Sequence, residues 1–184
     1  MLEKYFVEHC APTLATLKTA NLFSYNYDSE EELLKNFEYW KGQFSQKGVE
    51  IDVLKKDGGV ALIYVFRRDR LQSDLLRHGV KEFLAGYGYG SVAVDSAIAV
   101  LKSRLKDYNE FPHEVGLFLG YPLEDVVGFV ANGGENSKLT GCWKVYNNEN
   151  EAKKLFAKFN KCRLVYSRLW NNGERDVMQL TVAS

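Results

Sequence analysis

The chain has 184 residues, of which 46% are hydrophobic and 14% aromatic, and its 24 Lys and Arg residues balance its 24 Asp and Glu residues. This composition can fill a substantial core, so we expect a single globular domain over residues 1–184. The balanced charge, without a basic run, argues against nucleic-acid or anionic-membrane binding. No apolar stretch approaches the ~20 residues of a membrane span, and the first ten residues carry acids where a secretory signal carries basic charge, so we predict a cytoplasmic location.

The N-terminal residues predict two short helices and an extended segment. Residues 2–9 form the first helix. Pro12 is expected at the first position of a second helix that ends near residue 18, because the residue at that position does not need to donate an N–H within the helix. Residues 22–27 (LFSYNY) predict a strand or an extended link.

Residues 28–44 show the clearest helical pattern. Ser29 and Glu32 have the spacing of a capping box. Large apolar side chains recur on one face: Leu33, Leu34, Phe37, Trp40 and Phe44. We therefore predict that this face, with Phe37 near its middle, packs in the core.

Residues 49–55 and 60–66 predict an antiparallel hairpin. Apolar and charged residues alternate in the first segment, and the intervening KKDGG contains a turn signal. The second segment (VALIYVF) is apolar throughout, which is typical of a strand buried on both faces. We therefore expect residues 60–66 near the centre of the sheet.

The rest of the chain alternates between helical and strand-like patterns. Helices are expected at about 69–85, 91–106, 122–131 and 149–169, and strands near 113–119, 141–146 and 175–182. With the hairpin over 49–66, this order predicts an α+β fold in which helices pack against a mixed β-sheet. Leu117, in the middle of its predicted strand, is expected in the core.

The segment FPHEVGLFLGYPLEDVVGF (111–129) combines polar residues with an apolar run. In a strand over 113–119, neighbouring side chains point to opposite faces, so His113 and Glu114 would each need a separate partner. A structural and a functional role are equally plausible for both. Tyr121 follows in a loop, where binding residues are common. Two acids in the first turn of the next helix complement its dipole and would repel a phosphate.

Two further segments are candidate anion sites. Arg67, Arg68 and Arg70 follow the apolar strand and can hold a carboxylate or a phosphate, although solvated charges are the commoner explanation at strand ends. Residues 86–91 (GYGYGS) resemble a phosphate loop, but serine replaces the third glycine and a helix is expected before the loop. A helix C-cap followed by an N-cap is the favoured interpretation.

The three cysteines cannot all pair within one chain, so we expect reduced thiols. Cys162 continues an apolar helical stripe, and Cys142 shares one strand face with Lys144 in GCWKVY (141–146). Cys10 precedes the helix expected at Pro12, and a helix N-terminus lowers a thiol pKa. We therefore predict that Cys10 is the most reactive thiol, with simple burial as the alternative.

Three segments resemble an uncharacterised family of anaerobic Gram-positive bacteria that is catalogued as a domain of unknown function: HCAPTLATLKTANLF (9–23), FPHEVGLFLGYPLEDVVGF and GCWKVY. The similarity covers nearly the whole chain, and the middle segment is quite specific. It implies one intact domain and supplies no activity, cofactor or catalytic residue.

Polar residues in these segments exceed what packing requires, which predicts a site for a small ligand or a partner. The candidates are Cys10, Lys18, His113, Glu114 and Tyr121, with Arg67 and Lys144 as further ligand-binding residues.

Three alternatives remain open at this stage. A thiol-dependent enzyme would use Cys10 as nucleophile and His113 as base, with Glu114 as a further catalytic candidate. A transition-metal site could use the same three residues, but their spacing is not diagnostic and no metal is assigned. An interaction module would present aromatic side chains such as Tyr25, Tyr27, Tyr87 and Tyr89. The cofactor, the partner and the oligomeric state stay unknown.

Overall fold

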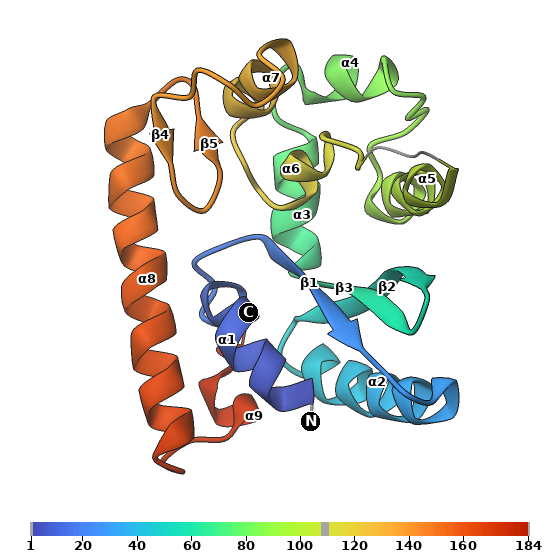
Figure 1. The fold of residues 1–184 in the computed structure, drawn as a ribbon, viewed down its shortest axis with the longest axis vertical. Coiled ribbons are helices and arrows are strands. Elements are labelled where there is room, and N and C mark those ends of the chain that lie inside the picture. The colour runs from blue at the N-terminus through green and yellow to red at the C-terminus, as the bar shows by residue number, and fades with distance from the viewer. Residues whose placement is uncertain (1, 108–110, 184) are drawn as a thin grey trace. The chain divides into compact units, whose positions relative to one another are not determined.

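The computed structural model describes residues 2–107 and 111–183, and Figure 1 shows the fold. The chain forms two compact units: Met1–Arg70 with Lys161–Ser184 is the first unit, and Leu71–Asn160 is the second. Two helices, α3 (Arg68–Leu75) and α8 (Glu149–Asn171), continue across the boundaries between the units. A single domain over residues 1–184 stays a prediction.

The first unit contains a three-stranded antiparallel sheet in the order β1–β3–β2. Its strands are β1 (Ala20–Asn26), β2 (Glu50–Asp57) and β3 (Val60–Phe66). In the central strand, Ile63 pairs with Phe23 on one side and with Val53 on the other. The predicted hairpin and its apolar central strand are confirmed.

Two helices pack on this sheet through apolar side chains. α1 (Leu2–Leu14) contacts β1, and α2 (Glu30–Ser45) contacts β2. Phe6 is fully buried, and its ring lies 4.9 to 6.0 Å from the rings of Phe23, Trp40 and Phe44. Such ring pairs add about 0.5–1.5 kcal/mol each beyond the area they bury. Phe37 is 8% exposed, so its predicted place in the core is confirmed.

The predicted helix start at Pro12 is wrong, because α1 is one helix with Pro12 in its last turn. Proline cannot donate to the carbonyl of Glu8, but Glu8 is exposed and water can bond that carbonyl instead. The carbonyl of Pro12 accepts hydrogen bonds from the N–H groups of Leu17 and Lys18 at 2.8 and 3.1 Å, which closes the helix.

The strand predicted at 175–182 is also wrong. The segment contains α9 (Val177–Leu180), which begins with a capping box formed by Asp176 and Gln179. Val177 and Leu180 are three residues apart and are both buried in the core of the first unit. Helical spacing places both side chains on one face, which a strand would not do.

The second unit is mostly helical. After most of α3 come α4 (Val80–Ala85), α5 (Val94–Asp107), α6 (Val115–Phe118), α7 (Leu123–Ala131), a hairpin of β4 (Leu139–Thr140) and β5 (Lys144–Val145), and the first part of α8. The helix expected at 69–85 is divided at Gly79, whose φ of +80° is left-handed. The strand expected at 141–146 is reduced to β5, because the N–H of Gly141 bonds the carbonyl of Trp143 in a turn.

The strand predicted near 113–119 is a short helix, α6, so that prediction is wrong. Residues 114–119 are all buried, whereas a strand with one face towards solvent would alternate. Leu117 is 3% exposed and lies in the core as predicted. Both sheets in the described residues are antiparallel, which corrects the expected mixed sheet, while the α+β class is confirmed.

Among residues 2–107 and 111–183, no helix combines the length and the apolar character that a membrane crossing requires.

Candidate functional site

Cys10 lies in the C-terminal half of α1, not before a helix N-terminus as expected. Its side chain is 0% exposed within the core of the first unit. Burial raises the pKa of the thiol far above its usual range, and the nearby charge of Lys18, which is itself 7% exposed, opposes this only in part. Because the thiolate is the nucleophile, this environment argues against Cys10 as a nucleophile near neutral pH.

We therefore expect Cys10 to be the least reactive of the three thiols, and not the most reactive as the sequence suggested. Cys142 is half-buried, whereas Cys162 is 9% exposed and burial raises its pKa to about 11. Iodoacetamide under native conditions should alkylate Cys142 first and Cys10 last, because a raised pKa leaves less thiolate at neutral pH.

Peptide mapping over a time course measures this order, and labelling in urea gives the control in which burial no longer separates the three thiols. Fastest native labelling of Cys10 would contradict its burial and restore it as a candidate nucleophile.

Glu114 belongs to a buried ion pair of the second unit. Its side chain is 0% exposed, and its Oε1 accepts hydrogen bonds from Nε of Arg104 and from the hydroxyl of Tyr89, the latter at 3.1 Å. Burial, and then the charge of Glu114, raise the pKa of Tyr89 well above its usual range. The adjacent His113 is exposed, and its ring lies 4.9 Å from that of Phe129. The two residues therefore have separate partners, although on a helix turn and not on a strand.

Three of the predicted residues, His113, Tyr121 and Lys144, line one pocket of about 300 Å³ in the second unit. Its walls include two pairs of rings. His113 pairs with Phe129, and Tyr121 stacks on Trp143 at 4.8 Å with an interplanar angle of 25°. We call it the aromatic pocket and define it by these residues together with Phe111 at its edge: Phe111, His113, Tyr121, Phe129, Trp143 and Lys144.

Asp125 connects α7 to the β4–β5 hairpin and so assembles the pocket. Its carboxylate is 3% exposed and accepts a hydrogen bond from Nε1 of Trp143 at 2.7 Å. The same carboxylate accepts from the backbone N–H groups of Tyr146 and Asn147 at 2.8 and 3.0 Å. The sequence suggested only a helix-dipole role for this acid, because no local pattern indicates its distant partners.

Tyr121 is positioned from both sides. Its hydroxyl donates to the carbonyl of Cys142 at 3.2 Å. Its ring also lies close to Gly116, where a Cβ would come within 3.0 Å of Cδ2 of Tyr121 and 2.8 Å of Cγ2 of Val126. A glycine is therefore required at position 116 for this packing, and it marks a close approach to a side chain within the protein.

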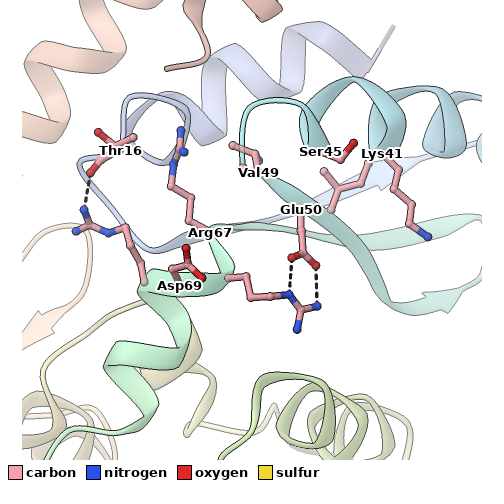
Figure 2. Close-up of a pocket in the computed structure, with 11 residues that line it drawn as sticks. Thr16, Lys41, Ser45, Val49, Glu50, Arg67 and Asp69 are labelled. Carbon is pink, nitrogen blue, oxygen red and sulfur yellow. Dashed lines mark hydrogen bonds and ion pairs between the residues drawn. The ribbon is translucent and has the colours of Figure 1, made fainter. Parts of the chain in front are cut away.

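Arg67 lies in the first unit, in the wall of a second pocket (Figure 2). It is 2% exposed and donates to the carbonyl oxygens of Thr13, Leu14, Lys47 and Val182 at 2.8 to 3.3 Å. Four of the five guanidinium N–H groups are thus engaged by the protein backbone. This arrangement indicates a structural role, because it satisfies carbonyl groups from three separate segments.

The structure also places the residues of the other two alternatives, the interaction module and the metal site. Of the tyrosines considered for an interaction surface, Tyr89 is 3% exposed, Tyr25 and Tyr27 pack against the core, and Tyr87 is half-buried. Within residues 2–107 and 111–183, no group of three or more His, Cys, Asp or Glu side chains is placed to hold a metal ion.

The fold defines a protein of the α+β class, with the aromatic pocket and the pocket beside Arg67 among its concave surfaces. The chain belongs to the family described as "Protein of unknown function (DUF3793)", whose family model matches residues 6–181. The comparisons found no match among curated proteins and none among solved structures.

Proposed function

We propose that the protein binds a small planar aromatic molecule in the aromatic pocket. The observation that carries this proposal is that aromatic side chains stay at the surface around a hollow: Phe111 is 48% exposed, and His113 is exposed as well. A volume of about 300 Å³ is at the lower end of small-molecule sites, which are mostly apolar and aromatic. A planar ligand would bury these rings in offset or edge-to-face contacts.

Lys144 supplies a polar contact for such a ligand. Its Nζ donates to the carbonyl of Gly134 at 2.5 Å and lies 6.0 Å from the ring centroid of Phe129. An ammonium group has three donors, so it can also bond an acceptor on the ligand. Asp125 has little remaining capacity to accept a hydrogen bond from the ligand, because its carboxylate already accepts three from the protein. The proposed ligand therefore carries an acceptor or acidic group. A cytoplasmic location stays a prediction beside this proposal.

We expect 2-naphthoate, as a probe, to shift the indole N–H resonance of Trp143 in NMR titrations. The Trp143→Phe variant identifies this resonance among the three indole signals. Its saturated analogue, decahydro-2-naphthoate, has the same charge and a similar size but no planar rings, and should bind more weakly. Replacing His113 by alanine should weaken naphthoate binding about tenfold, the equivalent of one lost aromatic contact.

His78→Ala is the matched control, because His78 is another exposed histidine of the second unit that does not line the pocket. The proposal would be abandoned if the Trp143 resonance did not respond, if the saturated analogue bound equally well, or if both histidine variants lost the same affinity.

A further inference from the structure

A second pocket, outside the proposed aromatic site, has a volume of about 630 Å³ and is lined entirely by residues of the first unit. Figure 2 shows that its side chains come from the turn after α1, the end of α2, the start of β2 and the junction of β3 with α3. We call it the basic pocket and define it by six of its lining residues: Thr16, Lys41, Glu50, Arg67, Arg68 and Arg70.

The lining of the basic pocket carries an excess of positive charge. Lys41 and three arginines face only two carboxylates, Glu50 and Asp69, so two positive charges remain. The whole chain has a formal net charge of zero, which makes this a local concentration. A concave surface lined with one sign of charge focuses the field and attracts ions of the opposite sign.

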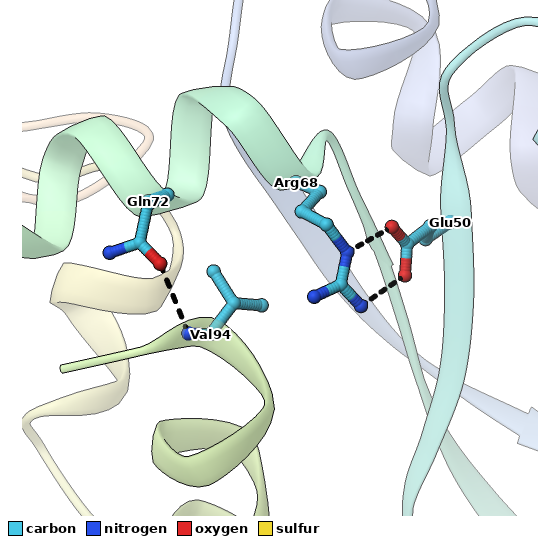
Figure 3. A network of polar contacts seen from close by, with 4 residues as sticks. All are labelled: Glu50, Arg68, Gln72 and Val94. Carbon is cyan, nitrogen blue, oxygen red and sulfur yellow. Dashed lines mark hydrogen bonds and ion pairs between the residues drawn. The ribbon is translucent and has the colours of Figure 1, made fainter. Parts of the chain in front are cut away.

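One of these cations forms an ion pair within the lining of the pocket. Arg68 donates two hydrogen bonds to the carboxylate of Glu50, from Nε to Oε1 at 2.5 Å and from Nη2 to Oε2 at 2.9 Å (Figure 3). Arg67 keeps its charge while bonding neutral carbonyl groups. Burial lowers the pKa of Arg67, and the positive charge of Arg70 lowers it further, which indicates like-charge repulsion between the two.

Arg70 and Lys41 are the cations that a ligand can reach. Both are exposed, and Lys41 has no ion-pair partner within residues 2–107 and 111–183. Arg70 donates from Nη1 to the carbonyl of Thr16 at 2.7 Å, which orients the guanidinium and leaves its other N–H groups for a ligand. Thr16 has a φ of +60°, an unfavourable conformation for a β-branched residue, and residues in strained conformations are often found at functional sites.

We propose that the basic pocket binds a small organic anion whose carboxylate or phosphate group is contacted by Arg70. Lys41 lies at the other end of the pocket from Thr16, to which Arg70 is bonded, and adds positive charge to the field (Figure 2). Guanidinium groups match both anions with paired hydrogen bonds, and an ammonium group adds a point charge. The site is independent of the aromatic pocket, which lies in the second unit.

Isothermal titration calorimetry of the full chain with two matched probe pairs tests the proposal. Glucose 6-phosphate is compared with glucose, and glutarate with glutaramide, so that each anion has a neutral counterpart of similar shape. At least one anion should bind about tenfold or more tightly than its counterpart, and its affinity should fall as salt is raised. Preference for the phosphate or the carboxylate would identify which of the two groups the site takes.

Charge-removing variants then locate the site. Arg70→Gln should weaken binding of the preferred anion about tenfold, the effect of losing one charge-assisted contact. Lys41→Gln should weaken binding less, because it removes a charge from the far end of the pocket. The controls are Arg175→Gln and Lys35→Gln, which remove the same charges from exposed positions of the first unit outside the pocket. Thermal unfolding of all four variants verifies that each is folded.

Either of two results would overturn the proposal: neither anion binds more tightly than its neutral counterpart, or the control variants weaken binding as much as Arg70→Gln. The second result would mean that the anion is attracted by the positive charge of the surface in general and not by the basic pocket.

Discussion

Replacing Arg67 by methionine should lower the free energy of unfolding of the first unit by about 3–5 kcal/mol. The substitution removes hydrogen bonds to the carbonyl groups of Thr13, Leu14, Lys47 and Val182. Thr13 and Leu14 are both 0% exposed, so water cannot readily replace the guanidinium at their carbonyl groups. Urea unfolding followed by circular dichroism measures the loss.

Two further variants separate this cause from a general effect of charge. Arg67→Lys keeps the charge but not the planar guanidinium group, and its free energy of unfolding should fall less than that of the methionine variant. Arg70→Met removes an exposed guanidinium that bonds the backbone carbonyl of Thr16, and this variant should lose far less stability. If Arg67→Met were as mild as Arg70→Met, the buried hydrogen bonds would not be what stabilises this part of the fold.

The ion pair of Glu114 and Arg104 should show strong energetic coupling in a double-mutant cycle. The two side chains are 0% and 15% exposed, so removing one partner leaves the other charge poorly solvated. Glu114→Met and Arg104→Met should each cost about 3–5 kcal/mol, and the double variant should cost at least about 2 kcal/mol less than the sum.

The exposed pair Lys154–Glu151 provides the control cycle, which should show no measurable coupling because solvent screens it. Additive effects of Glu114→Met and Arg104→Met would mean that the contact between these two side chains does not contribute to the free energy of unfolding. Calorimetric unfolding of the variants measures both cycles.

The elements that were predicted correctly have strong local patterns. The apolar face and the Ser29 cap define α2, and the hydroxyl of Ser29 accepts the N–H of Glu32 at 3.3 Å. In the hairpin, alternation, turn residues and a central apolar run all agree. Such signals depend on neighbouring residues only, so they are readable without the tertiary structure.

The wrong predictions concern segments whose burial is decided by distant parts of the chain. A short apolar run such as residues 115–119 fits a buried strand or a buried helix equally well, because enclosure on all sides removes the alternation that separates them. Pro12 was misplaced because local rules favour a proline in the first turn of a helix, whereas α1 carries it in the last turn, where water can bond the exposed carbonyl of Glu8.

For the candidate site too, the sequence shows which residues are unusual, and only the tertiary structure shows which of them meet. The sequence marked His113, Tyr121 and Lys144 as unusual polar residues but could not place them in one pocket. Their meeting depends on Asp125, whose hydrogen bonds reach Trp143, Tyr146 and Asn147, some twenty residues away.

By itself, the sequence determined the α+β class, the hairpin at 49–66, the helix through Phe37 and the balanced charge, since these follow from composition and short-range periodicity. Only the tertiary structure decided the surroundings of the polar candidates. It buries Cys10 and raises its pKa, bonds Arg67 to the backbone, and pairs Glu114 with Arg104. The physical reason is that burial, desolvation and ion pairing arise between segments far apart in the chain, where no sequence spacing records them.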